Sequence, residues 1–228
     1  MSISVLDREL YDIPLAASVL RVPASTLAWW LEGGKRNGRL YDPVIRPAPT
    51  GSKAVTWGEF VEARYVVGYR SGLGVRLMSL RRFIADARRA LGVSYPLAHE
   101  RPWVGGGRQL LVSAQRSSEL PAELWAMWVA DTGQIMLTAP AESFLERTEF
   151  HDDEAVRIHP LGHESPIVID PLVRFGAPSL RGIPTEAIAG QVGAGDPIEM
   201  VATDFGLCLD DVIAALNYER VLAPSAAA

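Results

Sequence analysis

A group of basic residues near the start of the chain could bind phosphate groups. Lys and Arg side chains neutralise the phosphates of a nucleic-acid backbone, and such contacts make binding sensitive to salt. A solvated surface charge is the alternative for each cation alone, but their grouping favours a shared phosphate-binding surface. The residues are Lys35, Arg36, Arg39, Arg46 and Lys53.

The segment before these cations must position them, and its pattern predicts two short helices joined by a turn. Apolar residues between Leu15 and Leu20 have helical spacing, the chain breaks near 21–23, and Gly33 with Gly34 ends the second helix. On a recognition helix, exposed side chains near the N-terminus reach base edges and phosphates. The corresponding residues here are Ser25, Thr26 and Trp29. Core packing is the alternative for the Trp.

Two short β-like patches follow, at 40–45 and 53–57, and a Pro- and Gly-rich bend separates them. This pattern predicts a hairpin or wing beside the second helix. A capping box at Thr56 and Glu59 then predicts the start of a longer helix.

The segment 77–91 predicts a helix with one apolar stripe. Leu80, Ile84 and Ala87 lie on that stripe, and most of the arginines lie off it. The stripe packs either inside its own domain or in a dimer seam. A homodimer is expected in either case, because helix-turn-helix proteins usually read two half-sites with two-fold symmetry.

Beyond Pro102 the sequence changes to short β-rich segments and then to helices. Strands are predicted at 108–114, 133–139, 143–150, 155–161 and 165–171. Helices are predicted from 184 to the end of the chain. We therefore expect an α+β fold with two domains. A winged helix-turn-helix domain spans 1–104, and 105–228 form a β-rich segment followed by a helical, helix-turn-helix-like module.

The net charge of −5 divides unevenly along the chain. Residues 1–110 hold 16 Lys and Arg against 9 Asp and Glu, whereas residues 111–228 hold 6 against 18. This asymmetry indicates one half that faces nucleic acid and one that faces another partner. It also decides between two helix-turn-helix spacings. The second, at 198–216, matches better by pattern, but its acidic residues repel phosphate, so we interpret it as structural or protein-binding.

Several other classes of protein are excluded by the sequence. The start of the chain lacks a signal peptide and no stretch is long and apolar enough to span a membrane, so we expect a cytoplasmic protein. One cysteine, Cys208, fits a reducing compartment. Acids and histidines gather at 151–163, but His159 and His163 flank a Pro–Gly loop with no helix to align them. We expect no metal site, no cofactor and no catalytic activity.

The two ends of the chain resemble two known families. DIPLAASVLRVPASTLAWW, residues 12–30, resembles the N-terminal helix-turn-helix of MerR-type regulators, with Arg21 where that family has a turn Gly and Ala28 where it has an Arg. Residues from Ile169-Asp170-Pro171 to Leu216 resemble a small domain that recurs in VapB-like antitoxins. The order of the two is similar to that of predicted antitoxins encoded beside toxins with PIN-type nuclease domains.

These resemblances imply a type II antitoxin that binds operator DNA and neutralises a cognate toxin, with a PIN-domain nuclease as the expected toxin. Arg174 and Arg181 are the candidate toxin-binding residues, since they could supply charge to the acidic site of a nuclease. The alternative is a MerR-like transcriptional regulator that responds to a small ligand. A cavity near Trp125 and Trp128 would favour that alternative.

Overall fold

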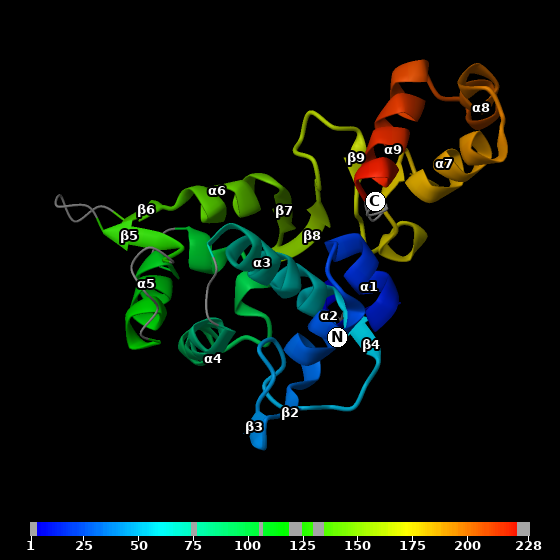
Figure 1. Cartoon of the computed structure of the whole chain (residues 1–228). Coiled ribbons are helices and arrows are strands. Elements are labelled where there is room, and N and C mark those ends of the chain that lie inside the picture. The colour runs from blue at the N-terminus through cyan, green and yellow to red at the C-terminus, as the bar shows by residue number, and fades with distance from the viewer. Residues whose placement is uncertain (1–3, 74–76, 105–106, 119–124, 130–134, 223–228) are drawn as a thin grey trace. The chain divides into compact units, whose positions relative to one another are not determined.

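A computed structural model of the whole chain describes residues 4–73, 77–104, 107–118, 125–129 and 135–222. The fold is α+β, as predicted, with many helices and small antiparallel sheets (Figure 1). It divides into two compact units. The first comprises residues 1–146 and 150–155, and the second comprises 147–149 and 156–228.

The predicted boundary at residue 104 lies inside the first of these units. The reason is that helix α5 (Gly107–Ser117) packs against α4 (Leu77–Leu91) and against the short helix η3 (Arg101–Trp103). Helix α4 buries Leu80, Phe83, Ile84 and Ala87, so contacts within the first unit account for its apolar stripe. No helix of the described residues combines the length and the apolar character that a membrane crossing needs.

The N-terminal elements follow closely from local signals. After η1 (Val5–Asp7) and β1 (Glu9–Asp12), helix α1 (Ile13–Leu20) is capped by Asp12, whose Oδ1 accepts a hydrogen bond from the Leu15 amide at 2.8 Å. Arg21 ends α1 in the left-handed conformation, with φ 58° and ψ 44°. Helix α2 (Ala24–Glu32) then begins after Pro23 and ends at Gly33.

The prediction of a hairpin between 40–45 and 53–57 is wrong, because these two segments do not pair with each other. Strand β2 (Gly34–Arg36) instead pairs with β3 (Arg39–Tyr41) across the two-residue turn Asn37–Gly38. Both turn residues have positive φ, 52° and 78°, as a tight hairpin turn of this kind requires. Strand β4 (Ala54–Thr56) pairs with β1. The Asn–Gly dipeptide was the signal that the sequence pattern offered and that the prediction missed.

Helix α3 (Trp57–Leu73) begins at the predicted capping box. The Thr56 amide donates to Glu59 Oε2 at 3.0 Å, and the Glu59 amide donates to Thr56 Oγ1 at 3.3 Å. Aromatic side chains around α3 form the core of the first unit. Tyr65 packs on Tyr69, Phe83, Trp103 and Phe144, with ring centroids 4.5–6.2 Å apart.

Two predicted strands are helical in the structure. Residues 108–114 belong to α5, and the first part of 143–150 belongs to α6 (Ala139–Glu146). Short apolar runs suit either period, and packing on α4 selects the helix for α5. The other elements of this region are η2 (Pro96–Ala98), β5 (Met127–Val129), β6 (Ile135–Leu137), β7 (Thr148–His151) and β8 (Glu154–Ile158).

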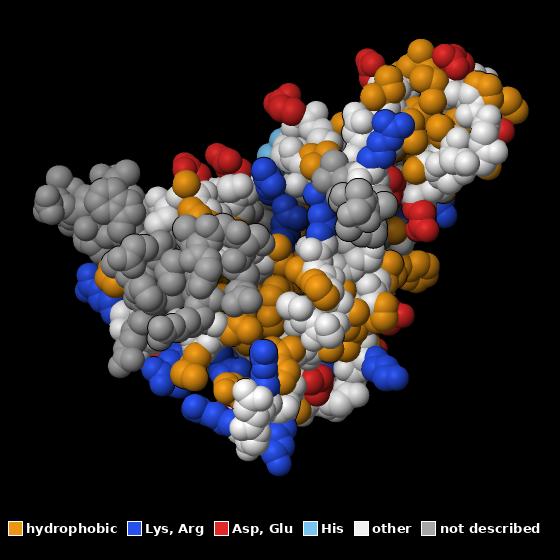
Figure 2. Space-filling view, viewed as in Figure 1, with side chains coloured by type: hydrophobic (Ala, Val, Ile, Leu, Met, Phe, Trp, Pro, Cys, Tyr) orange, Lys and Arg blue, Asp and Glu red, His pale blue; other side chains and the backbone are white. Residues whose placement is uncertain are grey.

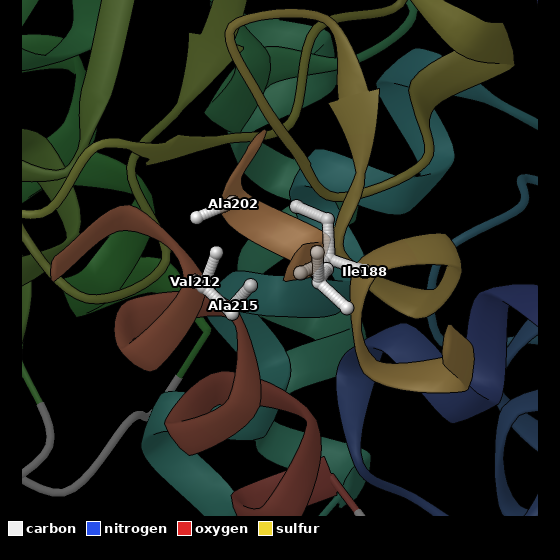
Figure 3. Packing of buried hydrophobic residues seen from close by; sticks show 5 residues of the cluster. Ile188, Ala202, Val212 and Ala215 are labelled. Carbon is white, nitrogen blue, oxygen red and sulfur yellow. The ribbon is translucent and has the colours of Figure 1, made fainter. Parts of the chain in front are cut away.

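The second unit combines a small sheet with three helices. Strands β9 (Ile167–Val168), β10 (Ser179–Leu180) and β11 (Ile183–Pro184) form an antiparallel sheet in the order β11-β10-β9, and η5 spans Arg174–Gly176. Helices α7 (Thr185–Ala194), α8 (Ile198–Phe205) and α9 (Leu209–Leu222) follow. They enclose a buried aliphatic cluster whose labelled members in Figure 3 are Ile188, Ala202, Val212 and Ala215.

Candidate functional site

Helix α2 is fixed by one buried face and presents the opposite face outward. Leu27, Trp30 and Leu31 are buried, whereas Ser25 is exposed and Thr26 is half-buried. The predicted base-reading positions at the start of α2 are therefore accessible. This placement follows from the helical period, since residues 27, 30 and 31 share one side of the helix.

Trp29 joins α2 to the hairpin and remains partly accessible. Its ring centroid lies 5.7 Å from that of Tyr41 on β3. It also covers the backbone at Gly34, where an added Cβ would stand 3.2 Å from the indole. The guanidinium of Arg39 lies 5.4 Å from the centroid of Tyr41 on the same hairpin. These aromatic contacts therefore fix the hairpin against the second helix.

Four of the five predicted cations are exposed: Lys35, Arg36, Arg39 and Lys53. Figure 2 shows Lys and Arg side chains gathered over the region of the β2–β3 hairpin. Within the described part of the chain, none of these four forms an ion pair with an acid. Arg36 and Arg39 stand directly opposite each other across the hairpin. Like charges in that position repel each other, and a bound anion would relieve the repulsion.

Arg46 does not belong to this surface, which corrects the prediction. It is only 5 % exposed. Its Nε donates to Glu59 Oε1 at 2.6 Å, and its Nη2 donates to Glu59 Oε2 at 3.1 Å and to the Ala54 carbonyl at 2.6 Å. Its Nη1 donates to Glu32, to Thr50 Oγ1 at 2.7 Å and to the Ser52 carbonyl at 3.0 Å. With its donors used in this way, Arg46 cannot also bind a phosphate.

The buried cation organises the segment between the hairpin and β4. Burial alone would lower the pKa of Arg46, but the hydrogen bonds and charges of Glu59 and Glu32 raise it above its usual value. Glu32 also accepts the amides of Thr50 and Gly51 at 3.0 and 2.9 Å. Burial alone would raise the pKa of Glu32, and these bonds, with those from the Thr50 hydroxyl and Arg46, lower it. Glu59 and Glu32 lie 13 and 14 residues from Arg46 in the sequence, so no local pattern predicted that these three side chains would pair.

The two predicted toxin-binding arginines lie on two segments of the second unit, Arg174 in η5 and Arg181 in the turn between β10 and β11. Arg174 is exposed, and its Nε donates to the carbonyl of Gly182 at 3.0 Å. The neighbouring residue Arg181 has a side chain 65 % exposed, with a guanidinium nitrogen 3.4 Å from the carboxylate of Asp211. The hydrogen bond from Arg174 to Gly182 therefore brings both arginines to the same part of the surface.

Two apolar side chains beside Arg174 were missed by the sequence analysis. Leu172 is 70 % exposed and Phe175 is 75 % exposed. Phe175 and Arg174 both have positive φ, 54° and 48°, which is an uncommon conformation for bulky residues. Phe and Arg side chains are enriched in protein interfaces, so these residues are a candidate protein-binding surface. Burial cannot be read from single residues in a loop, so the pattern gave no signal.

The helices of the second unit carry the acidic side chains expected from the sequence. Glu199, Asp204 and Asp210 are exposed, and Figure 2 shows acidic and hydrophobic side chains together over α7, α8 and α9. Asp211 is buried at the start of α9, where its Oδ2 lies 3.4 Å from the Cys208 amide. Cys208 itself is exposed.

The aromatic region invoked for a small ligand is described only in part. Trp125 is half-buried, with the guanidinium of Arg116 at 5.8 Å from its ring centroid. The side chain of Trp128 lies outside the described residues.

Comparisons with known proteins match nearly the whole chain. The uncharacterized protein Rv2308 of Mycobacterium tuberculosis is 33 % identical over 224 residues, which are 95 % of this chain and 92 % of the relative. A protein of the same organism named "Putative antitoxin VapB45" is 28 % identical over 226 residues, 92 % of this chain and 94 % of the relative.

Two further comparisons concern the fold and the C-terminal region. The crystal structure of Rv2018 from Mycobacterium tuberculosis matches with a TM-score of 0.72 and 27 % identity, and covers 93 % of this chain and 100 % of its own. Residues 167–218 match a family described as "Protein of unknown function (DUF433)". This range contains the segment that the sequence analysis related to antitoxins.

Proposed function

This chain belongs to the protein family of Rv2308, and from that membership and the likeness to VapB45 we propose that it is an antitoxin of a type II toxin–antitoxin pair. In this proposal the first unit binds operator DNA in the cytoplasm as part of a homodimer. The second unit neutralises a partner toxin, which is a PIN-type ribonuclease.

The exposed cationic hairpin beside α2 is the observation that carries the DNA-binding part. Lys35, Arg36 and Arg39 project from β2 and β3, and the elements occur in the order helix, turn, helix, hairpin that a MerR-type winged helix-turn-helix requires. DNA phosphates would separate the charges of Arg36 and Arg39, which face each other in the free protein. The hairpin and Lys53 thus provide the electrostatic part of binding.

Base reading falls to the start of α2. Ser25 and Thr26 present hydroxyl groups there, and a hydroxyl can donate to or accept from a base edge. Trp29 packs against Tyr41 and Gly34, so it sets the angle of the hairpin while its remaining exposed surface faces the DNA. Arg46 holds the loop behind this surface and touches no DNA.

Salt-dependent binding tests this assignment. The triple variant Lys35→Ala/Arg36→Ala/Arg39→Ala is titrated against the DNA upstream of the chain's own gene at two salt concentrations. Each lost phosphate contact reduces the slope of log K against log salt by about 0.9. We expect a clear loss of affinity and a slope shallower by up to roughly 3 for three contacts.

A matched variant controls for net charge. Arg89→Ala/Arg116→Ala/Arg220→Ala removes three exposed cations that belong to other elements, α4, α5 and α9. It should bind like the wild type, and light scattering of the free protein should give the mass of a dimer. Equal affinity and slope for the hairpin variant and the wild type would remove the hairpin from the proposal.

The partner surface comprises Arg174, Arg181, Leu172 and Phe175. Aromatic and Arg side chains dominate interface energies when they enter a desolvated pocket, and an arginine fits the carboxylates of a nuclease site. Co-expression with the product of the adjacent gene should yield a stable complex in which the nuclease is inactive. Phe175→Ser together with Arg174→Glu should dissociate it. Retention of the complex by that double variant would place the toxin elsewhere.

A further inference from the structure

We propose that Glu149, His159 and His163 of the second unit form a binding site for a divalent transition-metal ion of the zinc class. One ligand atom from each of the three side chains lies within 4.8 Å of the other two. Zinc takes imidazole nitrogens as ligands in proteins, so His159 and His163 would bind the ion, while Glu149 orients the ring of His159 through its other nitrogen. The proposal is independent of the proposed function, because it rests on this cluster alone.

Local backbone structure brings the two histidines together. The His159 amide donates to the Arg147 carbonyl at 2.8 Å, which fixes the end of β8 beside the start of β7. A tight turn follows, closed by the Gly162 amide donating to the His159 carbonyl at 3.1 Å, with Gly162 at φ 95°. The rings of His159 and His163 then stand 4.0 Å apart between centroids.

This turn is the reason that the proposal departs from the sequence-based expectation of no metal site. That expectation rested on the absence of a helix to align His159 and His163, and the turn aligns them instead. Glu149 was not among the candidates, because it lies on the neighbouring strand. His151, Asp153 and Glu154 were candidates, and they lie in the first unit, where Asp153 binds Arg101 and Glu154 binds Ser4.

The imidazole of His159 supplies a second, independent indication of a ligand. The residue is 8 % exposed, and its Nε2 lies 2.8 Å from Glu149 Oε1. Its Nδ1 is buried without a hydrogen-bond partner. A buried polar atom left unpaired costs about 1–3 kcal/mol, and coordination of a cation recovers such a cost. A carboxylate on one ring nitrogen with a metal on the other is a common arrangement of metal-binding histidines.

The charges around the cluster are compatible with a cation. Arg157 lies 3.0 Å from Glu149 Oε2, but it also lies 2.9 Å from Asp170, so two carboxylates share its charge. Arg147 donates to the carbonyl of Pro160 in the turn at 3.3 Å. Glu149 Oε1 remains on the side of the histidines, where it fixes the ring of His159 and supplies negative charge to the site.

An ion can enter the cluster from solvent with little rearrangement. His163 is exposed and Glu149 is half-buried, so water reaches the site from the side of the turn. Tetrahedral zinc with bonds of about 2.0–2.2 Å holds its ligand atoms roughly 3.4 Å apart, so ligand atoms that stand up to 4.8 Å apart must approach each other by up to about 1.4 Å. Rotation of the exposed His163 side chain provides that movement. Water completes the coordination shell.

Metal titration of the full-length chain without a histidine tag tests the proposal. After removal of metal with a chelator, Zn²⁺ is titrated by calorimetry and thermal unfolding is followed with and without Zn²⁺. We expect one ion per chain and a higher Tm in its presence. Co²⁺ should give the visible absorption of a site with nitrogen and oxygen ligands.

Two variants and a control locate the ion. His163→Ala should lose at least about tenfold in Zn²⁺ affinity and its Tm shift, while its metal-free Tm stays near that of the wild type because the side chain is exposed. Glu149→Gln, which keeps the shape of the side chain, should weaken binding as well. The control is His151→Ala, an exposed histidine outside the cluster, which should bind like the wild type. Absence of saturable binding by the wild type, or full affinity in His163→Ala, would overturn the proposal.

Discussion

The helix pairs α1–α2 and α8–α9 share a local geometry and differ in their charges. In the first pair, Arg21 is left-handed and the Val22 amide donates to the Ala17 carbonyl at 3.0 Å. In the second, Gly206 is left-handed and the Leu207 amide donates to the Ala202 carbonyl at 2.8 Å. The turn is therefore the same in both units.

The second helices of the two pairs carry different side chains in their first turns. Helix α2 starts with Ala24, Ser25 and Thr26 and leads into a cationic hairpin, whereas α9 has Asp210 and Asp211 in its first turn. Spacing thus determines the path of the backbone, and charge determines which partner the second helix can accept. A helix-turn-helix pattern alone therefore identifies a turn and not a DNA-binding site.

The largest effect that we expect comes from the cation behind the first pair. Arg46→Ala leaves Glu59 and Glu32 without their shared partner in a largely buried place. Removal of one partner from a buried ion pair costs about 3–5 kcal/mol. Denaturant unfolding followed by Trp fluorescence measures this in the first unit, because all six Trp residues belong to it.

Arg36→Ala is the matched control, since it removes an exposed Arg from the same region and should change the free energy of unfolding by less than about 0.5 kcal/mol. Similar stabilities of the two variants would show that Arg46 is a surface cation after all.

The second expected effect is a pH dependence of the stability of the first unit, which the second unit does not share through this group. Burial raises the pKa of Glu62 to about 8, because the nearby charge of Arg88 and the bond from the Leu97 amide offset only part of the desolvation. The folded state therefore favours the protonated acid. Its contribution to stability is complete below the unfolded pKa near 4.5 and is lost as the pH rises through 8.

Glu62→Gln should flatten this dependence, which at its steepest is about 1.4 kcal/mol per pH unit. Unfolding by urea at pH 5, 6, 7 and 8, each value being about one unit from the next, gives the slopes. An unchanged slope in the variant would assign the pH dependence to another group.

The third prediction concerns a variant in which the first turn of α2 carries two acidic residues, as the first turn of α9 does. Ser25→Asp/Thr26→Asp should reduce DNA affinity by about tenfold or more, because two carboxylates then face the phosphates. Folding should be retained, since acids in the first turn of a helix interact favourably with its dipole by about 0.3–1 kcal/mol each. Ser25→Asn/Thr26→Asn is the neutral control. Undiminished DNA binding by the acidic variant would contradict the idea that charge separates the two pairs.

The smallest effects concern the shared turn. Gly206→Ala introduces a Cβ that meets nothing within 4 Å, so only its φ of 66° opposes the change, and we expect a loss of about 1 kcal/mol. Arg21→Gly should change stability in the opposite direction by roughly 0.5 kcal/mol. Thermal unfolding detects both. Effects of the same sign would show that the two turns are not equivalent.

Local signals predicted the helices at the two ends of the chain, but missed α5 and α6 and the partners that are distant in the sequence. The turn at Arg21 and the box at Thr56 and Glu59 were identified from neighbours in the chain, and the structure has both as local contacts. The cap of α1 by Asp12 is local as well, but the sequence analysis did not name it. Residues 108–114, predicted as a strand, are helical in the structure because they pack against α4. A local sequence pattern contains no information about that contact.

The residues of the candidate site also divide into those that local patterns predicted and those that depend on distant partners. The sequence predicted the exposure of Lys35, Arg36 and Arg39, because hairpins and polar segments lie at surfaces. It could not predict that Arg46 is buried, since the two acids that bind it lie on the helices α3 and α2, 13 and 14 residues away in the sequence. The pairing of Glu149 with His159 was missed for the same reason. The role of a residue whose partners are distant in the sequence can be identified only once the fold is known.

The position of Arg46 has a consequence for how this family can diversify. The residues that fasten the loop, Arg46 with Glu32 and Glu59, are separate from the residues that the hairpin exposes. Exposed positions on β2 and β3 can therefore be exchanged without disturbing the anchor beneath them. Sequence variation should accordingly concentrate at 35–40 and be low at 32, 46 and 59.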